Sequence, residues 1–267
     1  MRRVHLVEIE DLSWCPAVIR ETSTDFLFGL YNLLNVYESA YEKIAEVLDK
    51  TNTNTIVDCC SGTGGPIKKL RDYFDQHQKK DVTIFLTDKY PNFQSFEKFE
   101  KEYPANVIGI TESVDASQIP SSLKGMRTFF SSFHHFKPEC AAKILQDAVK
   151  NEVPIAIFES TQRHPIDFIQ ALLSPLAVWF VLPFSKRLTL KKIIFTYLIP
   201  VTPFVFMWDY FVSIFRTYSL RELQALTQQI QAGSYHWEFG KLKSRKRNEG
   251  VIYLIGYKKN KVQDNLI

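Results

Sequence analysis

The sequence predicts an α/β fold, in which a seven-stranded and mostly parallel sheet is covered by helices on both faces. From residue 55 onward, short apolar runs of strand length alternate with amphipathic stretches of helix length. The last two apolar runs, 235–243 and 251–258, follow each other with only a short basic loop between them. Such a pair is typical of an antiparallel hairpin. The alternation before it favours parallel strands, because each helix returns the chain to the same end of the sheet.

Residues 1–50 are predicted to form a helical extension before the sheet. Apolar side chains between Leu27 and Leu48 recur at the spacing of one helix face. The pattern changes at Thr55, where short apolar runs begin. We therefore expect the core to start at residue 51.

The core is expected over residues 51–164 and 219–260. Apolar runs predict strands at 55–60, 82–88, 107–111, 126–131 and 154–160, followed by the hairpin. Amphipathic runs predict helices at 66–74, 93–103, 138–151 and 220–231. Pro138 favours a helix start, because proline lacks the N–H that stays unpaired in the first turn.

The segment 165–218 between the two parts of the core is apolar and aromatic. Its 23 residues from 193 to 215 contain one charged side chain, Asp209, and would be long enough to span a membrane. Pro200 and Pro203 interrupt this run, and the sheet resumes directly after it. We predict a helical lid that buries its apolar faces on the core, over the ligand cleft. Peripheral contact with a membrane is the alternative.

Composition limits the function classes. The net charge of +4 is small for 267 residues, and the only basic run, 241–247, is expected to be a solvated loop, so we predict no nucleic-acid partner. The four cysteines show no paired spacing, which predicts neither a disulfide framework nor a metal site. The first residues lack the apolar stretch of a signal peptide, and we expect a cytoplasmic protein.

A glycine cluster follows the first predicted strand. Gly62, Gly64 and Gly65 are three of only ten glycines, and they lie between a strand and a helix. A turn there lets backbone N–H groups approach an anionic or polar ligand, although a tight turn without a ligand is the alternative. A dinucleotide fingerprint would need a further glycine where Ile67 stands, which disfavours a nicotinamide-dependent reductase. Instead, an acidic residue, Asp58, precedes the glycines.

The run from Asp58 to Gly64 resembles motif I of class I S-adenosylmethionine-dependent methyltransferases, which is roughly acidic-x-Gly-x-Gly-x-Gly. Cys60 stands where the family has its first glycine. Asp88 matches the acidic residue that binds both ribose hydroxyls in this family, and 114–116 matches the segment that recognises the adenine amino group. The run 129–136 is similar to a histidine-containing form of motif IV. The resemblance covers about residues 50–160 and 219–258, and it implies a Rossmann-like sheet with the hairpin at its edge.

The resemblance implies S-adenosylmethionine as cofactor. The implied cofactor-binding residues are Asp58, Cys60, Ser61, Gly62, Thr63, Gly64, Asp88, Asp115, Ala116 and Ser131. Most of them follow predicted strand ends, and the crevice rule for open parallel sheets independently places ligands there. The implied reaction is methyl transfer to an O, N or C nucleophile of a small, largely apolar or aromatic acceptor.

Candidate catalytic residues are His134, His135 and Glu159. Imidazole titrates near neutral pH and could orient or deprotonate an acceptor, although hydrogen-bonded packing is an equal alternative. We expect the acceptor to be bound by residues of the extension, the core and the lid, namely Tyr31, Phe133, Arg163, Trp208, Asp209, Arg216 and Tyr218. The other hypotheses are the reductase and a non-catalytic, membrane-associated module that retains the fold.

Overall fold

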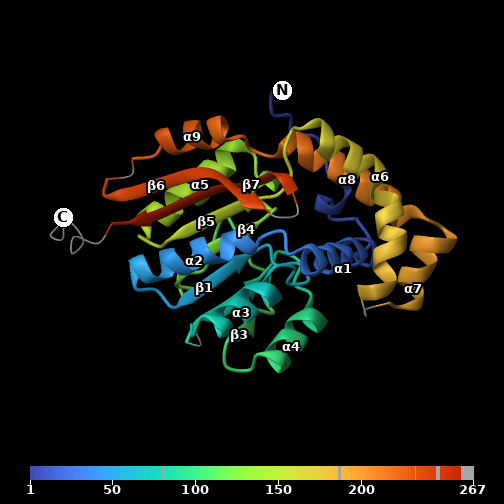
Figure 1. Ribbon diagram of the computed structural model, residues 1–267, viewed down its shortest axis with the longest axis horizontal. Coiled ribbons are helices and arrows are strands. Elements are labelled where there is room, and N and C mark those ends of the chain that lie inside the picture. The colour runs from blue at the N-terminus through green and yellow to red at the C-terminus, as the bar shows by residue number, and fades with distance from the viewer. Residues whose placement is uncertain (80, 186–187, 232, 245–246, 260–267) are drawn as a thin grey trace.

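The computed structural model describes residues 1–267 except 80, 186–187, 232, 245–246 and 260–267, and it confirms the predicted sheet. The seven strands lie in the order β3-β2-β1-β4-β5-β7-β6 (Figure 1). All pairs are parallel except those of β7, which is antiparallel to both β5 and β6. The strands are β1 Thr55–Cys59, β2 Thr83–Thr87, β3 Val107–Gly109, β4 Met126–Phe130, β5 Ile155–Glu159, β6 Tyr235–Ser244 and β7 Arg247–Lys258. The tip of the basic loop falls at 245–246, outside the described residues.

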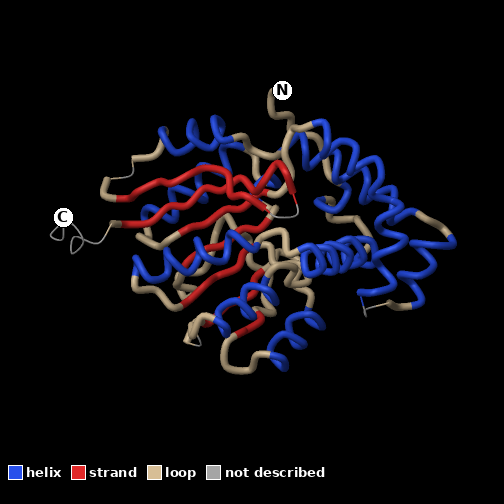
Figure 2. The backbone as a smooth tube through the Cα atoms, in the orientation of Figure 1, coloured by secondary structure: helices blue, strands red, loops and turns tan. Residues whose placement is uncertain are grey.

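Helices cover both faces of this sheet (Figure 2). One face packs on α2 Glu38–Thr51, α3 Ile67–Gln76 and α4 Phe93–Glu102. The other packs on α5 Pro138–Lys150 and α9 Leu220–Gln228. Side chains of a strand point alternately to the two faces, so Ile56 joins the first core and its neighbour Val57 joins the second. The strands therefore read as continuous apolar runs, because both of their faces are buried.

The register aligns the carboxyl ends of the central strands. Cys59, the last residue of β1, lies beside Thr87 of β2 and Phe129 of β4. After β1 the chain forms β2 on one side of this strand, and later it returns to form β4 on the other side. Loops that leave these three strands consequently surround one crevice at the switch point of the sheet.

The N-terminal extension is helical only from residue 17. Before α1 Ala17–Leu34, residues 1–8 form no helix or strand, and residues 9–15 form one 3-10 turn, η1 Ile9–Asp11, followed by bends and turns. The expectation of a helical extension over all of residues 1–50 is therefore corrected for the first sixteen residues. Pro16 precedes α1 in an extended conformation, which a helix interior does not allow.

The segment 165–218 forms a helical hairpin at one end of the molecule (Figure 1). It contains α6 Pro165–Val181, the turn η3 Leu182–Ser185, α7 Leu190–Ile193, the π-helical turn η4 Ile194–Leu198 and α8 Val201–Arg216. The hydroxyls of Thr161 and Thr217 are 2.7 Å apart, so the hairpin leaves and rejoins the core at one place. Residues 165–184 are long and apolar enough to cross a membrane, whereas 190–198 and 201–216 pass that test only together and are bent by 75°.

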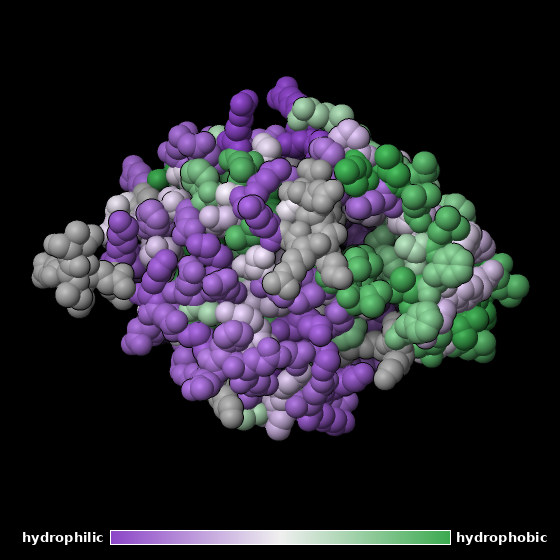
Figure 3. All heavy atoms as spheres, viewed as in Figure 1, coloured by the Kyte–Doolittle hydropathy of each residue, from purple (hydrophilic) through white to green (hydrophobic). Residues whose placement is uncertain are grey.

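The hairpin does not bury its apolar faces as predicted. Val178, Leu182 and Phe206 pack against Phe26 of α1, but among the described residues no element covers the outer side of α6, where Leu172 is 62% exposed. The apolar side chains of this segment gather at one end of the surface (Figure 3). The prediction was wrong because a helix rich in apolar residues all round gives no sign of which side meets the core.

Candidate active site

A cavity of about 850 Å³ opens at the carboxyl ends of β1, β2 and β4. This volume lies within the range of roughly 300–1,000 Å³ that is usual for small-molecule sites. The loops after β1, β2 and β3 form one side, and α1 with the preceding N-terminal residues forms the other. None of the described residues of the hairpin 165–218 lines the cavity, so the expected lid position is wrong. The physical reason is that the hairpin packs on the outer side of α1, which itself lies across the cavity.

The glycine turn after β1 shapes the floor of the cavity. Ser61 N–H donates to Thr87 O of β2 over 2.9 Å, and Gly64 N–H donates to Ser61 O over 2.7 Å. Gly64 has a φ of +77°, and a Cβ there would lie 2.4 Å from the ring of Phe99. Only glycine meets both the conformational and the steric requirement at this position. Ser61, Gly62 and Thr63 line the cavity, whereas Gly64 faces α4 and does not.

Asp58 is buried beneath the turn and does not line the cavity. Its carboxylate oxygens accept hydrogen bonds from Thr128 Oγ1 and Ser61 Oγ, both over 2.7 Å. Burial raises the pKa of Asp58 to about 7, although these hydrogen bonds act in the opposite direction. The sequence analysis expected Asp58 and Gly64 to contact a cofactor directly. In the structure they instead support the loop that lines the site.

Two non-glycine residues at the cavity have left-handed backbone conformations. Cys60 follows β1 with a φ of +58°, and Ser131 follows β4 with a φ of +44°. Both line the cavity. A left-handed conformation costs an L-residue roughly 1–2 kcal/mol. Cys60 thus occupies a backbone position that suits glycine, as the motif resemblance implies.

Asp88 lies at the cavity wall after β2. Its Oδ2 accepts from Gly62 N–H and its Oδ1 from Tyr90 N–H, each over 2.8 Å. The carboxylate thus joins the turn after β1 to the loop after β2, and burial raises its pKa. Because a carboxylate has about four acceptor positions, two backbone donors leave acceptor capacity on the side that faces the cavity.

The loop after β3 forms the next part of the wall. Asp115 and Ala116 line the cavity. Val114 N–H donates to Asp88 O over 2.9 Å, which joins this loop to the one after β2. Asp115 is held by Ser117, whose N–H and Oγ both donate to Asp115 Oδ1. Three successive loops are thus connected by hydrogen bonds along one wall.

His134 and Glu159 form a buried pair that does not line the cavity. The Glu159 side chain accepts from His134 N–H over 3.0 Å and lies 2.8 Å from His134 Nδ1. Both side chains are at most 3% exposed. The prediction that these two residues act on an acceptor by direct contact is therefore wrong. They fix the turn η2 Phe133–His135, which carries the second histidine to the cavity.

His135 does line the cavity, and carboxylates surround it. Its Nδ1 lies 2.9 Å from Asp11 Oδ1 and 3.1 Å from Glu8 Oε2. Although burial disfavours the charged imidazole, the two carboxylates raise the pKa of His135 to about 10. The two carboxylates therefore favour the protonated imidazole, a form with no lone pair that could take a proton from an acceptor.

The ligand atoms of Glu8, His134 and His135 lie within 4.8 Å of one another, a spacing that would suit a metal ion. The buried guanidinium of Arg216 lies 3.4 Å from Glu8 Oε1 and supplies a positive charge at the same place. Charge balance at this cluster therefore needs no metal. The sequence analysis did not identify this group, because its acidic member comes from the N-terminal residues, far from the histidines in the sequence.

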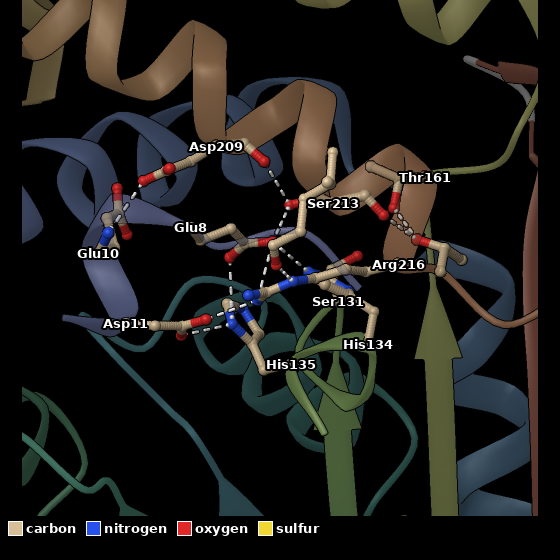
Figure 4. Close-up of polar contacts among 12 residues, drawn as sticks. Glu8, Glu10, Asp11, Ser131, His134, His135, Thr161, Asp209, Ser213 and Arg216 are labelled. Atoms are coloured by element: carbon tan, nitrogen blue, oxygen red, sulfur yellow. Dashed lines mark hydrogen bonds and ion pairs between the residues drawn. The ribbon is translucent and has the colours of Figure 1, made fainter. Parts of the chain in front are cut away.

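The N-terminal strap, defined as residues 3–11, runs along α8 and reaches the cavity (Figure 4). Asp209 accepts from Ile9 N–H over 2.6 Å and from Glu10 N–H over 3.1 Å. Arg216 donates to Leu6 O over 2.7 Å and to the Asp11 carboxylate over 2.5 Å. These contacts position Glu10 and Asp11, both of which line the cavity.

Most of the predicted acceptor-binding residues hold this strap or its surroundings instead of facing the cavity. Trp208 donates to Val7 O, the ring of Tyr218 lies 4.0 Å beneath the Arg3 guanidinium, and Arg163 pairs with Glu222. Phe133 is fully buried in the core. Of the residues predicted to bind the acceptor, only Tyr31 lines the cavity; the corrected ones are Phe133, Arg163, Trp208, Asp209, Arg216 and Tyr218.

Sequence reasoning missed the residues that close the cavity from the N-terminal side. They include Glu10, Asp11, Glu21, Thr24 and Leu27. The guanidinium of Arg20 lies 4.2 Å above the ring of Tyr90 and also donates to Glu10 O, so it connects α1, the strap and the loop after β2. The acidic group 8–11 was a visible signal, but nothing in the sequence connected it to strands more than forty residues away.

No family model and no curated protein sequence matches the chain. Similar solved structures include the plantazolicin methyltransferase in complex with S-adenosylhomocysteine, at 12% identity and a TM-score of 0.47, covering 91% of this chain and 85% of that one. An O-methyltransferase family protein from Burkholderia thailandensis is 13% identical with a TM-score of 0.47, covering 86% of this chain and 58% of that one.

An O-methyltransferase from neocarzinostatin biosynthesis, in complex with S-adenosylmethionine, is 12% identical with a TM-score of 0.45. The match covers 83% of this chain and 57% of that one, so this chain spans little more than half the length of the two O-methyltransferases. Another similar structure is described as a pericyclic reaction enzyme. At such low identity the likeness concerns the fold. The Rossmann-like sheet with an antiparallel edge, expected from the resemblance to class I methyltransferases, is present.

Replacing Cys60 tests the left-handed backbone at the end of β1. We expect Cys60→Gly to leave the free energy of unfolding within about 1 kcal/mol of wild type, because glycine adopts this φ freely. Cys60→Val should lower it by about 2 kcal/mol or more, since a β-branched residue is least tolerated there. Urea unfolding followed by circular dichroism measures both variants. Equal stability of the two would contradict the assigned conformation.

Replacing Asp209 tests how the strap is held. Asp209→Ala removes the acceptors of the Ile9 and Glu10 amides, so we expect these amides to exchange with solvent at least about tenfold faster, the scale of a lost hydrogen bond to a charged group. Asp81→Ala, at an exposed aspartate, is the matched control. Hydrogen exchange measured by mass spectrometry on N-terminal peptides gives the result. Unchanged exchange in Asp209→Ala would show that the strap is held in another way.

Proposed function

We propose that this chain transfers a methyl group from S-adenosylmethionine to a small, largely apolar acceptor. The observation that carries the proposal is a single cavity that joins the glycine turn, Asp88 and Asp115 to a wall from α1 and the strap. The motif resemblance assigns the first three features to a cofactor. The opposite wall then provides a place for an acceptor.

The cavity residues fit the proposed cofactor. Asp88 offers its remaining acceptor capacity to the two ribose hydroxyls, and the loop at Asp115 and Ala116 would hold the adenine. Residues 60–63 would hold the rest of the molecule, because the positive φ values there turn the backbone under the cavity. S-adenosylmethionine, when bound, supplies an electrophilic methyl group on a sulfonium ion. The main contribution of the protein is alignment of the acceptor with that methyl group.

The other side of the cavity offers an acceptor an apolar patch beside the charged side chains of Glu10, Asp11, Arg20 and Glu21. Leu27 and Tyr31 of α1 face it together with Phe130 after the switch point, and Ser131 is the adjacent polar group. The Ser131 hydroxyl is fixed by Tyr37 OH at 2.6 Å and Ser160 Oγ at 2.8 Å. Apolar walls with a few fixed polar groups are usual for small-molecule sites.

Glu10 is a better candidate base than either histidine. It lines the cavity, and burial together with the neighbouring Asp209 carboxylate raises its pKa to about 8. A base with a pKa near the working pH combines the deprotonated form with useful basicity. His135, as a cation, would contribute a positive charge and hold Asp11. Glu10 would act only for an acceptor that must lose a proton.

Two other functions would give different results in a ligand-binding experiment. A nicotinamide-dependent reductase is disfavoured because Ile67, where the dinucleotide fingerprint needs glycine, is fully buried at the start of α3. A non-catalytic module would keep the fold but bind no cofactor. Isothermal calorimetry with S-adenosylhomocysteine and NADH separates them: only S-adenosylhomocysteine should bind, and binding of NADH alone or of neither ligand would overturn the proposal.

Asp88→Ala tests the ribose contact. We expect the affinity for S-adenosylhomocysteine to fall by about 1.5–3 kcal/mol, roughly ten- to a hundredfold, because hydrogen bonds to a charged group are lost. Asp81→Ala is the control, and a urea unfolding curve checks that loss of the Gly62 contact has not unfolded the turn. An unchanged dissociation constant in a folded Asp88→Ala protein would restrict Asp88 to a structural role.

The pH dependence tests Glu10. With an acceptor identified from a panel of phenols and amines, turnover should fall as the pH drops through about 8, because protonated Glu10 cannot take a proton. Glu10→Gln should lower turnover by about a hundredfold, within the usual range for a general base, while S-adenosylhomocysteine affinity stays the same. Glu112→Gln, at an exposed site, is the control. A wild-type profile retained in Glu10→Gln would exclude Glu10 as the base.

A further inference from the structure

The outer side of α6 is apolar and packs on no other element in the part of the chain that the structure describes. From Pro165 to Phe184 the exposed residues are all apolar except Gln170. The large ones recur at helical spacing and are Ile166, Ile169, Leu172, Leu173, Leu176 and Phe180. Asp167, the charged residue of this helix, is fully buried. The exposed apolar stripe therefore continues along the whole helix without a charge.

Exposure is greatest at the tip of the hairpin, where α6 ends and η4 turns back toward α8. Phe184, Leu198, Leu190 and Phe180 are 82%, 76%, 73% and 73% exposed. The hairpin forms the far end of the molecule in Figure 1, and the same end is covered by apolar side chains in Figure 3. The apolar surface is thus convex and projects away from the sheet.

We propose that the hairpin 165–218 is a membrane-docking surface that inserts its tip into one leaflet of a lipid bilayer. The hairpin leaves and rejoins the core at the Thr161 and Thr217 hydroxyls, so it enters and returns on the same side and does not cross. The 75° bend between 190–198 and 201–216 brings the chain back. The protein is in this way monotopic.

Several features favour lipid over a protein partner. Soluble monomers rarely expose continuous apolar patches beyond a few hundred Å². A protein partner would need a concave surface that matches the tip, whereas a fluid bilayer accommodates a convex one. Tyr197 and Trp208 lie on the hairpin, 42% and 46% exposed, and such side chains are common at the level of lipid headgroups. The exposed cation Lys191 lies beside Leu190, in a position to meet anionic headgroups.

An apolar groove adjoins the tip. It has a volume of about 500 Å³ and is lined by Ile9, Ile199, Pro200, Val201, Phe204 and Val205. Every one of these side chains is apolar, so an acyl chain would be a suitable occupant. Val178, Leu182 and Phe206 of the hairpin also belong to an apolar cluster with Leu27, which lines the large cavity. Docking would therefore place that cavity close to the lipid surface.

Vesicle co-sedimentation tests docking independently of methyl transfer. The full chain is mixed with vesicles of equal parts phosphatidylcholine and phosphatidylglycerol, in low and in high salt. Phe180→Glu and Leu198→Glu replace exposed side chains at the tip, and Leu33→Glu, at a 69% exposed site at the sheet end of α1, is the matched control. Calorimetry with S-adenosylhomocysteine on the same samples reports separately on the cofactor site.

We expect wild type and Leu33→Glu to sediment with vesicles in both salts, because burial of apolar side chains resists screening. Each tip variant should partition at least about tenfold more weakly, a change of about 1.4 kcal/mol. Unchanged binding in the tip variants, or binding lost in high salt, would overturn insertion. The proposal would also be overturned if the protein did not bind vesicles but formed a dimer by light scattering, and the tip variants dissociated that dimer. The partner of the tip would then be a second copy of the chain.

Discussion

The hydrogen bonds of the buried Asp58 carboxylate hold together the elements around which the cavity is built. One oxygen accepts from Thr128 on β4, and the other accepts from Ser61 in the turn after β1. Ser61 N–H in turn donates to Thr87 on β2. A single carboxylate and one serine thus connect all three strands at the switch point. Because a buried polar group without partners is costly, this arrangement favours one conformation of the loop.

The second constraint is the pairing of the N-terminal strap with α8. An apolar helix carries few polar side chains, and here Asp209 and Arg216 bind the backbone and carboxylates of residues 6–11. The buried positive charge of Arg216 is balanced by Glu8 and Asp11. The hairpin thereby contributes to the cavity indirectly, since it positions residues that line the cavity without lining it itself. The side of the hairpin that does not pack on α1 or the strap is exposed.

Local sequence predicted well which residues at the strand ends line one side of the cavity, for a physical reason. Gly62, Asp88 and Asp115 each lie just after a strand, and parallel strands bring their carboxyl ends to one edge. Alternation of strands and helices is visible in the sequence, so the neighbourhood of these residues follows from it. The opposite side, formed by α1 and the strap, could not be predicted in this way. Tyr31 was expected there, but Glu10 and Asp11 reach the cavity only because α8, two hundred residues later, binds the strap.

The sequence by itself determined the α/β sheet, the glycine turn and the acidic residues at the strand ends, because period and spacing along the chain fix local structure. Only the tertiary structure decided that His134 is buried against Glu159 while its neighbour His135 faces the cavity. It also decided that the apolar segment 165–218 lies beside α1 rather than over the cavity. Apolar residues on every side of a helix carry no directional information, so packing against α1 and the strap determined which side remained exposed.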